Sequence, residues 1–235
     1  MSENIKKTTK AFRVDLDSSK NQIMLKPIAR YSFNNQTHQV SEATEKIHEL
    51  IKNASYSNDD IVLKRNEIKE AFFSPFKPQL KNAQVFLSHL HADKNKALEV
   101  KDYLENQTKR KVFIDSLFWD YKDGVLNELA KHDDISRIKD AFTLILRESL
   151  QDMIEKCPYF VFLQSKNSVS NQGLSRITYS AWIYEELKIA HSISAISESR
   201  PIPIMESIQV FHDISPFLEN LKTITLSELS RIINS

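Results

Sequence analysis

The stretch QVFLSHLHAD, residues 84–93, joins a short apolar run to polar residues and to the start of a predicted helix. Two later runs have the same form, KVFID over 111–115 and YFVFL over 159–163. Apolar residues at helical spacing fill the segments between the three runs. Short apolar strands that alternate with helices are typical of a parallel sheet covered on both faces. We therefore predict an α/β fold with a parallel sheet.

The alternation continues to the end of the chain. The predicted elements are helices over 93–107, 135–154 and 180–192, a fourth strand beginning at 202–204, and a helix that follows residues 224–226. Ligands of such sheets bind beyond the carboxyl ends of the strands. The polar residues that follow these runs are therefore candidates for a functional site.

The first 80 residues have a different pattern. Their predicted elements are two strands of a small hairpin, over 11–16 and 23–33, and two helices, over 41–53 and 59–73. The segment SPFKP, residues 74–78, breaks the helical pattern. We therefore predict a small α+β N-terminal extension of unknown role over 1–80 and an α/β domain over 81–235.

The composition excludes several classes of protein. Only two glycines occur, whereas an average usage of ~7% predicts about sixteen. Phosphate sites on glycine-rich loops need several closely spaced glycines, so we expect neither a redox dinucleotide enzyme nor a P-loop NTPase. The net charge of +1 gives no indication of binding to nucleic acid or to a membrane.

The single cysteine, Cys157, allows neither an intrachain disulfide nor a zinc site with several cysteines. We expect it to be a buried structural thiol. The N-terminus has no apolar secretory core, and no apolar run approaches the ~18 residues of a membrane helix. We therefore expect a soluble, cytoplasmic protein.

A metal site is one interpretation of the first strand end. His89, His91 and Asp93 form H-x-H-x-D, which is similar to the metal motif of metallo-β-lactamases. Two alternate histidines of an extended segment could share a zinc ion. That motif continues with another histidine, whereas Lys94 stands here, and that fold opens with antiparallel strands. A metal-dependent hydrolase is therefore the less favoured interpretation, and a purely structural role for both histidines is the other alternative.

Three strings in order favour a different interpretation. They are FLSH over 86–89 with Asp93 opening the next helix, VFID over 112–115 followed by a loop with Trp119, and SAWIYEEL over 180–187. In this order they resemble a Toll/interleukin-1 receptor (TIR) domain of the bacterial branch. The likeness begins at about residue 83 and extends to the C-terminus.

The resemblance implies a flavodoxin-like sheet and, as in many bacterial and plant members, cleavage of NAD⁺ at the nicotinamide–ribose bond. The family's catalytic glutamate lies four residues after the tryptophan, which places it at Glu186. Trp182 and Glu186 share a helix face, whereas Glu185 is rotated about 100° away. A carboxylate suits this reaction because charge develops on the ribose as nicotinamide leaves.

Other residues near the presumed cleft are candidates for binding the substrate. Aromatic rings could stack on nicotinamide or adenine, and polar groups beside a helix N-terminus could meet phosphate. The candidate substrate-binding residues are Ser88, His89, Asp93, Asp115, Trp119, Trp182 and Tyr184.

The resemblance also implies partners. We expect NAD⁺ as substrate with no separate cofactor or metal, self-association through TIR–TIR contacts, and a role in anti-phage defence. In Thoeris-type members an ADP-ribose-derived product activates a downstream effector. In the family the loop after the second strand, here 116–125, helps to complete a neighbour's site. Two segments depart from the family's pattern, 116–134 and the long link 164–181, and a non-catalytic TIR adaptor is the alternative function.

Overall fold

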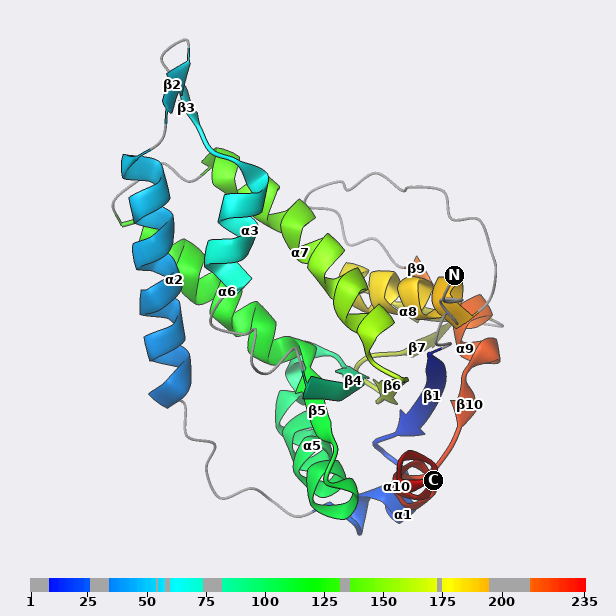
Figure 1. The fold of residues 1–235 in the computed structure, drawn as a ribbon. Coiled ribbons are helices and arrows are strands. Elements are labelled where there is room, and N and C mark those ends of the chain that lie inside the picture. Colours follow the sequence, from blue (N-terminus) through cyan, green and yellow to red (C-terminus); the bar gives the residue numbers. More distant parts are fainter. Residues whose placement is uncertain are drawn as a thin grey trace, which may run out of the picture. The chain divides into compact units, whose positions relative to one another are not determined.

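The computed structural model describes residues 9–25, 34–53, 55–57, 60–73, 82–131, 136–172, 175–194 and 212–235. These residues form two compact units, which Figure 1 shows with their elements labelled. The first unit comprises the described residues of Met1–Ile28, Ala83–Asp115 and Gln151–Ser235, and the second those of Ala29–Asn82 and Ser116–Leu150.

The first unit is built on a five-stranded parallel sheet. Its strands are β1 (Lys10–Asp15), β4 (Ala83–Ser88), β5 (Lys111–Ile114), β6 (Tyr159–Gln164) and β10 (Lys222–Thr223). Their order is β10-β1-β6-β4-β5, and every pairing between them is parallel. The α/β class predicted from the alternating runs is therefore present.

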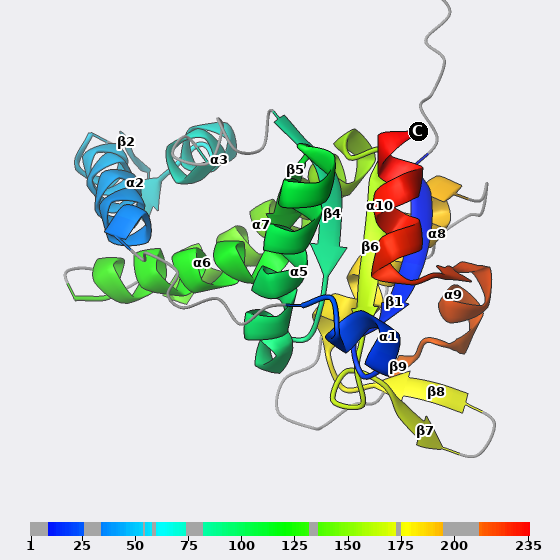
Figure 2. The same ribbon diagram turned by 90° about the horizontal axis from the view of Figure 1, so that it is seen from below.

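Helices cover both faces of this sheet. They are α5 (Lys94–Thr108), α8 (Ala181–Ser194) and α10 (Leu226–Asn234), with the shorter η2 (His91–Asp93), α1 (Ser19–Gln22) and α9 (Ser215–Asn220). Figure 2 shows α5 and α10 side by side over one face and α8 behind the sheet. A small antiparallel sheet of β7 (Ser170–Gln172), β8 (Ser175–Thr178) and β9 (His212–Asp213) lies beyond the carboxyl ends of the strands (Figure 2).

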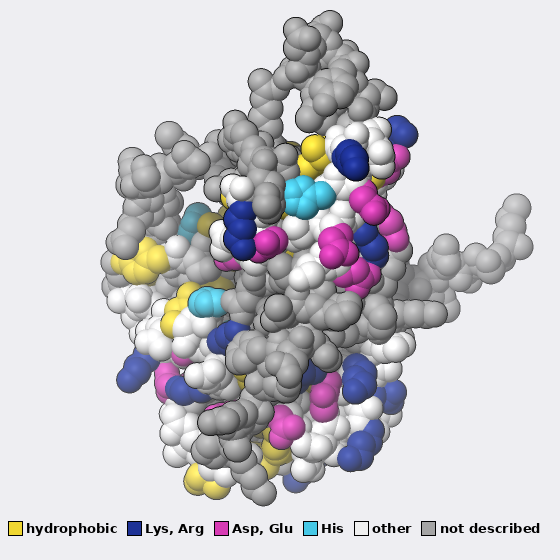
Figure 3. Space-filling view, turned by 90° about the vertical axis from the view of Figure 1, so that its left-hand side faces the viewer, with side chains coloured by type: hydrophobic (Ala, Val, Ile, Leu, Met, Phe, Trp, Pro, Cys, Tyr) yellow, Lys and Arg dark blue, Asp and Glu magenta, His cyan; other side chains and the backbone are white. Residues whose placement is uncertain are grey.

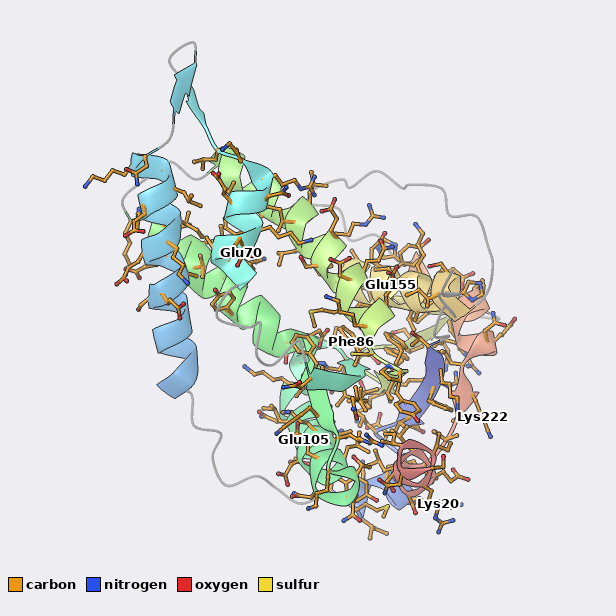
Figure 4. All side chains as sticks on the ribbon, viewed as in Figure 1. Lys20, Glu70, Phe86, Glu105, Glu155 and Lys222 are labelled. Carbon is orange, nitrogen blue, oxygen red and sulfur yellow. The ribbon has the colours of Figure 1, made fainter. Side chains whose placement is uncertain are left out.

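The apolar strand sequences explain why the sheet forms. Phe86, which Figure 4 labels on β4, stacks on Phe113 of β5 and Phe160 of β6, with ring centroids 5.7 and 5.8 Å apart. Val85 and Leu87 on the opposite face of β4 are also buried. Strands buried on both faces need continuous apolar runs, and this is what the three runs supply.

The N-terminal strand lies inside this sheet. β1 pairs in parallel with β6 along its whole length and with β10 on its other side. The strand predicted over 11–16 is present as β1, but the predicted hairpin pairing with 23–33 is wrong, because β1 pairs with β6 and β10 and is followed by α1. Residues 26–33 lie outside the described part of the chain, as does the strand predicted at 202–204. The division predicted at residue 80 does not coincide with the compact units, because β1 belongs to the first of them.

The strand order departs from a simple flavodoxin-like sheet. In that fold the strands follow the order 2-1-3-4-5. Counted from β4, the strands β5, β4 and β6 follow the order 2-1-3, but the next position holds β1. The sheet therefore matches the flavodoxin-like order on one side only.

The second unit contains α2 (Asn34–Lys52), α3 (Arg65–Phe73), α6 (Asp115–Leu129), the first part of α7 (Ser136–Lys156) and the hairpin of β2 (Ser55–Ser57) and β3 (Asp60–Val62). Its core includes Phe72, whose ring contacts Tyr121 and Phe142 at centroid distances of 5.0 and 4.8 Å. Tyr121 also donates a hydrogen bond to the Phe72 carbonyl, at 2.7 Å.

The loop predicted after the second strand is wrong. Residues 116–129 belong to the helix α6, in which Tyr121, Val125 and Leu129 are buried at a spacing of four residues. One helix face is thus apolar, and Gly124 does not interrupt it. The segment 116–125, predicted as a loop that helps to complete a neighbour's site, is therefore helical.

One face of the molecule carries described side chains of both charges. Figure 3 shows Lys and Arg side chains interspersed with Asp and Glu on the face that it presents. In the described part of the chain, no helix has the length and apolar character needed to cross a membrane. Cys157 is buried beside the Ala83 carbonyl, and burial raises the pKa of its thiol to about 12, as expected for a structural cysteine.

Candidate functional site

Four polar side chains meet at the carboxyl ends of two neighbouring strands. Ser88 ends β4 and His89 follows it, while Asp115 follows β5 and lies in the first turn of α6. Glu186 comes from α8. All four are buried, with exposed fractions of 0% for Ser88 and Glu186, 3% for His89 and 4% for Asp115. The strand ends thus concentrate polar groups where ligands of parallel sheets bind.

His89 and Asp115 form a close pair. The Nδ1 atom of His89 lies 2.6 Å from Oδ1 of Asp115, and both side chains are almost fully buried. The separation is that of a charge-assisted hydrogen bond, although the ring N–H is not aligned with the oxygen. Asp115 also lies in the first turn of α6, where an acidic side chain interacts favourably with the helix dipole.

Glu186 is held in an environment that disfavours its charge. Burial raises the pKa of this carboxyl well above its ordinary value of 4.5, and the negative charge of Asp115 raises it further. Contact with Ser88 acts in the opposite direction but is the weaker influence. The site therefore disfavours the charged form of Glu186 relative to a glutamate in water.

The cluster has unused hydrogen-bonding capacity. Among the described residues, no group makes a hydrogen bond of good geometry to either carboxylate oxygen of Glu186, to Ser88 Oγ or to His89 Nε2. Ser88 and Asp115 are near enough to change the pKa of Glu186 without forming such bonds. Buried polar groups in folded proteins are nearly always hydrogen-bonded, so a group that is not requires an explanation. Perturbed buried acids of this kind concentrate at functional sites.

Asp93, unlike these four residues, has its carboxylate bound by neighbouring side chains. Its carboxylate accepts hydrogen bonds from Ser165 Oγ at 2.5 Å and from the Asn167 side chain at 3.1 Å. Ser165 Oγ accepts in turn from the backbone N–H groups of Asn167 and Ser168. This network ties the end of β6 to the start of α5. The contacts support Asp93 as an anchor for the strand ends rather than as a substrate ligand.

This assignment gives a first prediction. Ser165→Ala should lower the free energy of unfolding by about 1–3 kcal/mol, because a buried carboxylate oxygen loses its donor. Denaturant unfolding monitored by circular dichroism measures the change. Ser19→Ala, at an exposed position in α1, is the matched control and should change stability little. Equal effects of the two substitutions would contradict the anchoring role.

Of the three predicted aromatic candidates, Tyr184 lies on a different side of α8 from Glu186. Tyr184 is two residues before Glu186, so it projects from nearly the opposite side of α8. Its ring stacks on His212 at 4.9 Å and meets Phe217 edge-on at 5.5 Å. Trp182 is half-buried and shares the helix face of Glu186. The Trp119 side chain lies outside the described residues, although its backbone is in α6.

Glu185, the neighbour of Glu186, has a different environment. Its carboxylate lies 4.0 Å from the Lys188 ammonium, and both side chains are partly exposed. Only one of the two adjacent glutamates therefore reaches the buried cluster, and it is the one that the spacing from Trp182 predicts.

The three residues of the metal motif do not converge. His89 is buried against Asp115, His91 is exposed in η2, and Asp93 is bound to Ser165 and Asn167. Within the described residues, no group of three or more His, Cys, Asp or Glu side chains has an arrangement that could hold a metal ion.

Sequence reasoning missed two features of this site. The pairing of His89 with Asp115 follows from adjacent parallel strands, β4 and β5, whose carboxyl ends lie together, and this signal was present in the two runs. The anchoring of Asp93 by Ser165 depends on a loop conformation that has no pattern in the sequence. Comparisons of the chain with protein-family models, with curated proteins and with solved structures found no match.

Proposed function

We propose that this chain is a TIR-type NAD⁺ nucleosidase that cleaves the nicotinamide–ribose bond. It would deplete NAD⁺ or make an ADP-ribose-derived signal in bacterial defence against phage. The observation that carries the proposal is Glu186. It is the glutamate that the resemblance names, and it lies buried with Ser88, His89 and Asp115 at the carboxyl ends of β4 and β5.

The chemistry of the cluster suits this reaction. Departure of nicotinamide leaves oxocarbenium-like positive charge on the ribose, and a carboxylate beside it stabilises that charge. The leaving group is a cationic pyridinium, so it needs no strong general acid. A site that excludes water strengthens the electrostatic interaction.

The raised pKa of Glu186 is compatible with this role. A resting neutral acid avoids an unpaired buried charge. When the cationic nicotinamide ring approaches, opposite charge favours the carboxylate, so the substrate itself promotes the reactive form.

A pH dependence follows. In the free enzyme the reactive carboxylate forms only as pH rises through the raised pKa of Glu186. We therefore expect kcat/KM for NAD⁺ to increase with pH, with a midpoint above 4.5. Initial rates measured at subsaturating NAD⁺ from pH 4 to pH 9 test this. A value of kcat/KM that is constant or falls over that range would contradict the proposed role of the ionised form.

Product identification tests the function itself. The purified full chain is incubated with NAD⁺, and products are identified by mass spectrometry. Free nicotinamide, together with ADP-ribose or a cyclic or conjugated derivative, is the expected result. Because Glu186 is fully buried, the assay should be run over a series of protein concentrations, which would also detect activation by self-association.

A non-catalytic TIR interaction module is the second candidate, and one observation favours it. The 0% exposure of Glu186 means that no substrate reaches the carboxylate in this conformation. A chain that self-associates but releases no nicotinamide at any concentration would support this candidate over the enzyme.

A further inference from the structure

We infer that His89 accepts the proton of the water molecule that attacks the ribose, and that Asp115 positions His89 for this task. The inference rests on the proposed function and deepens it. It gives a role to two residues that the resemblance offers only as candidates for binding substrate.

The geometry of the pair supports this role. Nδ1 of His89 lies 2.6 Å from Oδ1 of Asp115, and a carboxylate at this distance favours the tautomer with its proton on Nδ1. The other ring nitrogen, Nε2, then carries a lone pair. In the described part of the chain, Nε2 is buried and makes no hydrogen bond of good geometry. An imidazole oriented by a carboxylate through Nδ1, with Nε2 available, is the arrangement of a general base.

The surrounding charges fit the change of protonation. When Nε2 takes up a proton the ring becomes cationic, and the adjacent Asp115 carboxylate stabilises it. A purely structural buried histidine would leave Nε2 without a partner at a free-energy cost of about 1–3 kcal/mol.

The proposed step balances. The bond between C1′ of the ribose and N1 of nicotinamide breaks, and its electron pair returns to the pyridine ring, which leaves neutral. A bond forms between the water oxygen and C1′. The proton of that water passes to His89 Nε2 and later to solvent, so the products are ADP-ribose, nicotinamide and one proton.

The separate roles proposed for Glu186 and His89 predict that substitution of His89 affects attack by water and attack by a pyridine differently. Water must lose a proton as it attacks, so its reaction depends on a base. A neutral pyridine such as 3-acetylpyridine attacks through its ring nitrogen and has no proton to lose. Hydrolysis and base exchange therefore share the Glu186-dependent cleavage but differ in their need for His89.

The test uses His89→Asn in the full chain. The Asn amide can donate to Asp115 in place of Nδ1–H, but it provides no base at the position of Nε2. With NAD⁺ and 3-acetylpyridine, we expect hydrolysis to fall by roughly 10²-fold while exchange falls much less. The ratio of exchange to hydrolysis is measured within one sample, so a partly unfolded preparation does not change it. Asp115→Asn should also raise the ratio of exchange to hydrolysis, because it leaves His89 poorly oriented.

The failures can be distinguished. An unchanged ratio in His89→Asn, whether or not both rates fall, would overturn the inference and leave the proposed function standing. Wild-type protein that forms cyclic or base-exchange products through attack by a ring nitrogen, but no ADP-ribose, would also overturn the inference and leave the proposed function standing. Wild-type protein that releases no nicotinamide would overturn the proposed function and, with it, the inference.

Discussion

Glu186→Gln is expected to lower the rate of NAD⁺ cleavage by about 10²–10³-fold, the loss typical when one preorganised electrostatic group is removed. In the proposed reaction the carboxylate interacts with charge that exists only in the transition state. Its loss should therefore lower kcat far more than it raises KM. Nicotinamide release at saturating and at subsaturating NAD⁺ separates the two constants.

The geometry makes glutamine a conservative replacement. Its amide oxygen can accept from Ser88 and its NH₂ group can donate to Asp115, as the neutral acid would. Glu185→Gln is the matched control, because Glu185 faces Lys188 instead of the cluster. Loss of activity in Glu185→Gln with full activity in Glu186→Gln would show that the wrong glutamate has been assigned. Full activity in both would remove the basis of the catalytic assignment.

The same substitution is expected to stabilise the fold at neutral pH. The pKa of Glu186 is raised by burial and by Asp115, so the folded state binds its proton more tightly than the unfolded state. Stability from this difference is fully present below the unfolded pKa and is lost as pH rises toward the folded value. Each tenfold difference in proton affinity is worth about 1.4 kcal/mol. Glutamine does not ionise, so the Glu186→Gln variant does not lose this stability as pH rises.

The measurement is the Tm of wild type and variant as a function of pH. The two should be similar near pH 4, and the variant should gain about 2–4 °C per kcal/mol as pH rises to 8. Glu185→Gln should show no such divergence. A variant less stable than wild type at pH 8 would mean that the Glu186 carboxylate is satisfied in the fold. A gain in stability with a loss of activity is the trade-off expected of a functional residue.

Much of the sheet could be predicted because its strands are short apolar runs. Residues 85–88, 112–114 and 160–163 are buried, so the runs are continuous and their ends are marked by polar residues. The grouping of Ser88 with Asp115 follows from the shared direction of parallel strands. The i, i+4 spacing from Trp182 identified which of two adjacent glutamates faces the cluster.

Other features could not be read from local pattern. The run over 11–16 has the alternation of a half-buried strand, and a nearby partner was assumed. Its true partners are distant in the chain, and no local signal encodes that distance. For α6 the signal was present in Tyr121, Val125 and Leu129, but Gly124 and the resemblance to TIR domains, which have a loop here, favoured the opposite interpretation. The role of Asp93 was missed because its donor, Ser165, follows a different strand.

The central position of β1 has a consequence for how the chain folds. The Thr9 hydroxyl, just before β1, donates a hydrogen bond to the Cys157 carbonyl, just before β6, and the two residues are 148 positions apart in the sequence. Contacts of such high sequence separation slow folding, because the entropy of closing a long loop is lost before the contacts form. During synthesis, β1 leaves the ribosome before β6 and β10 and must wait for both of its partners. A fragment beginning at residue 81 would leave the facing edges of β6 and β10 unpaired, and unpaired edges promote aggregation.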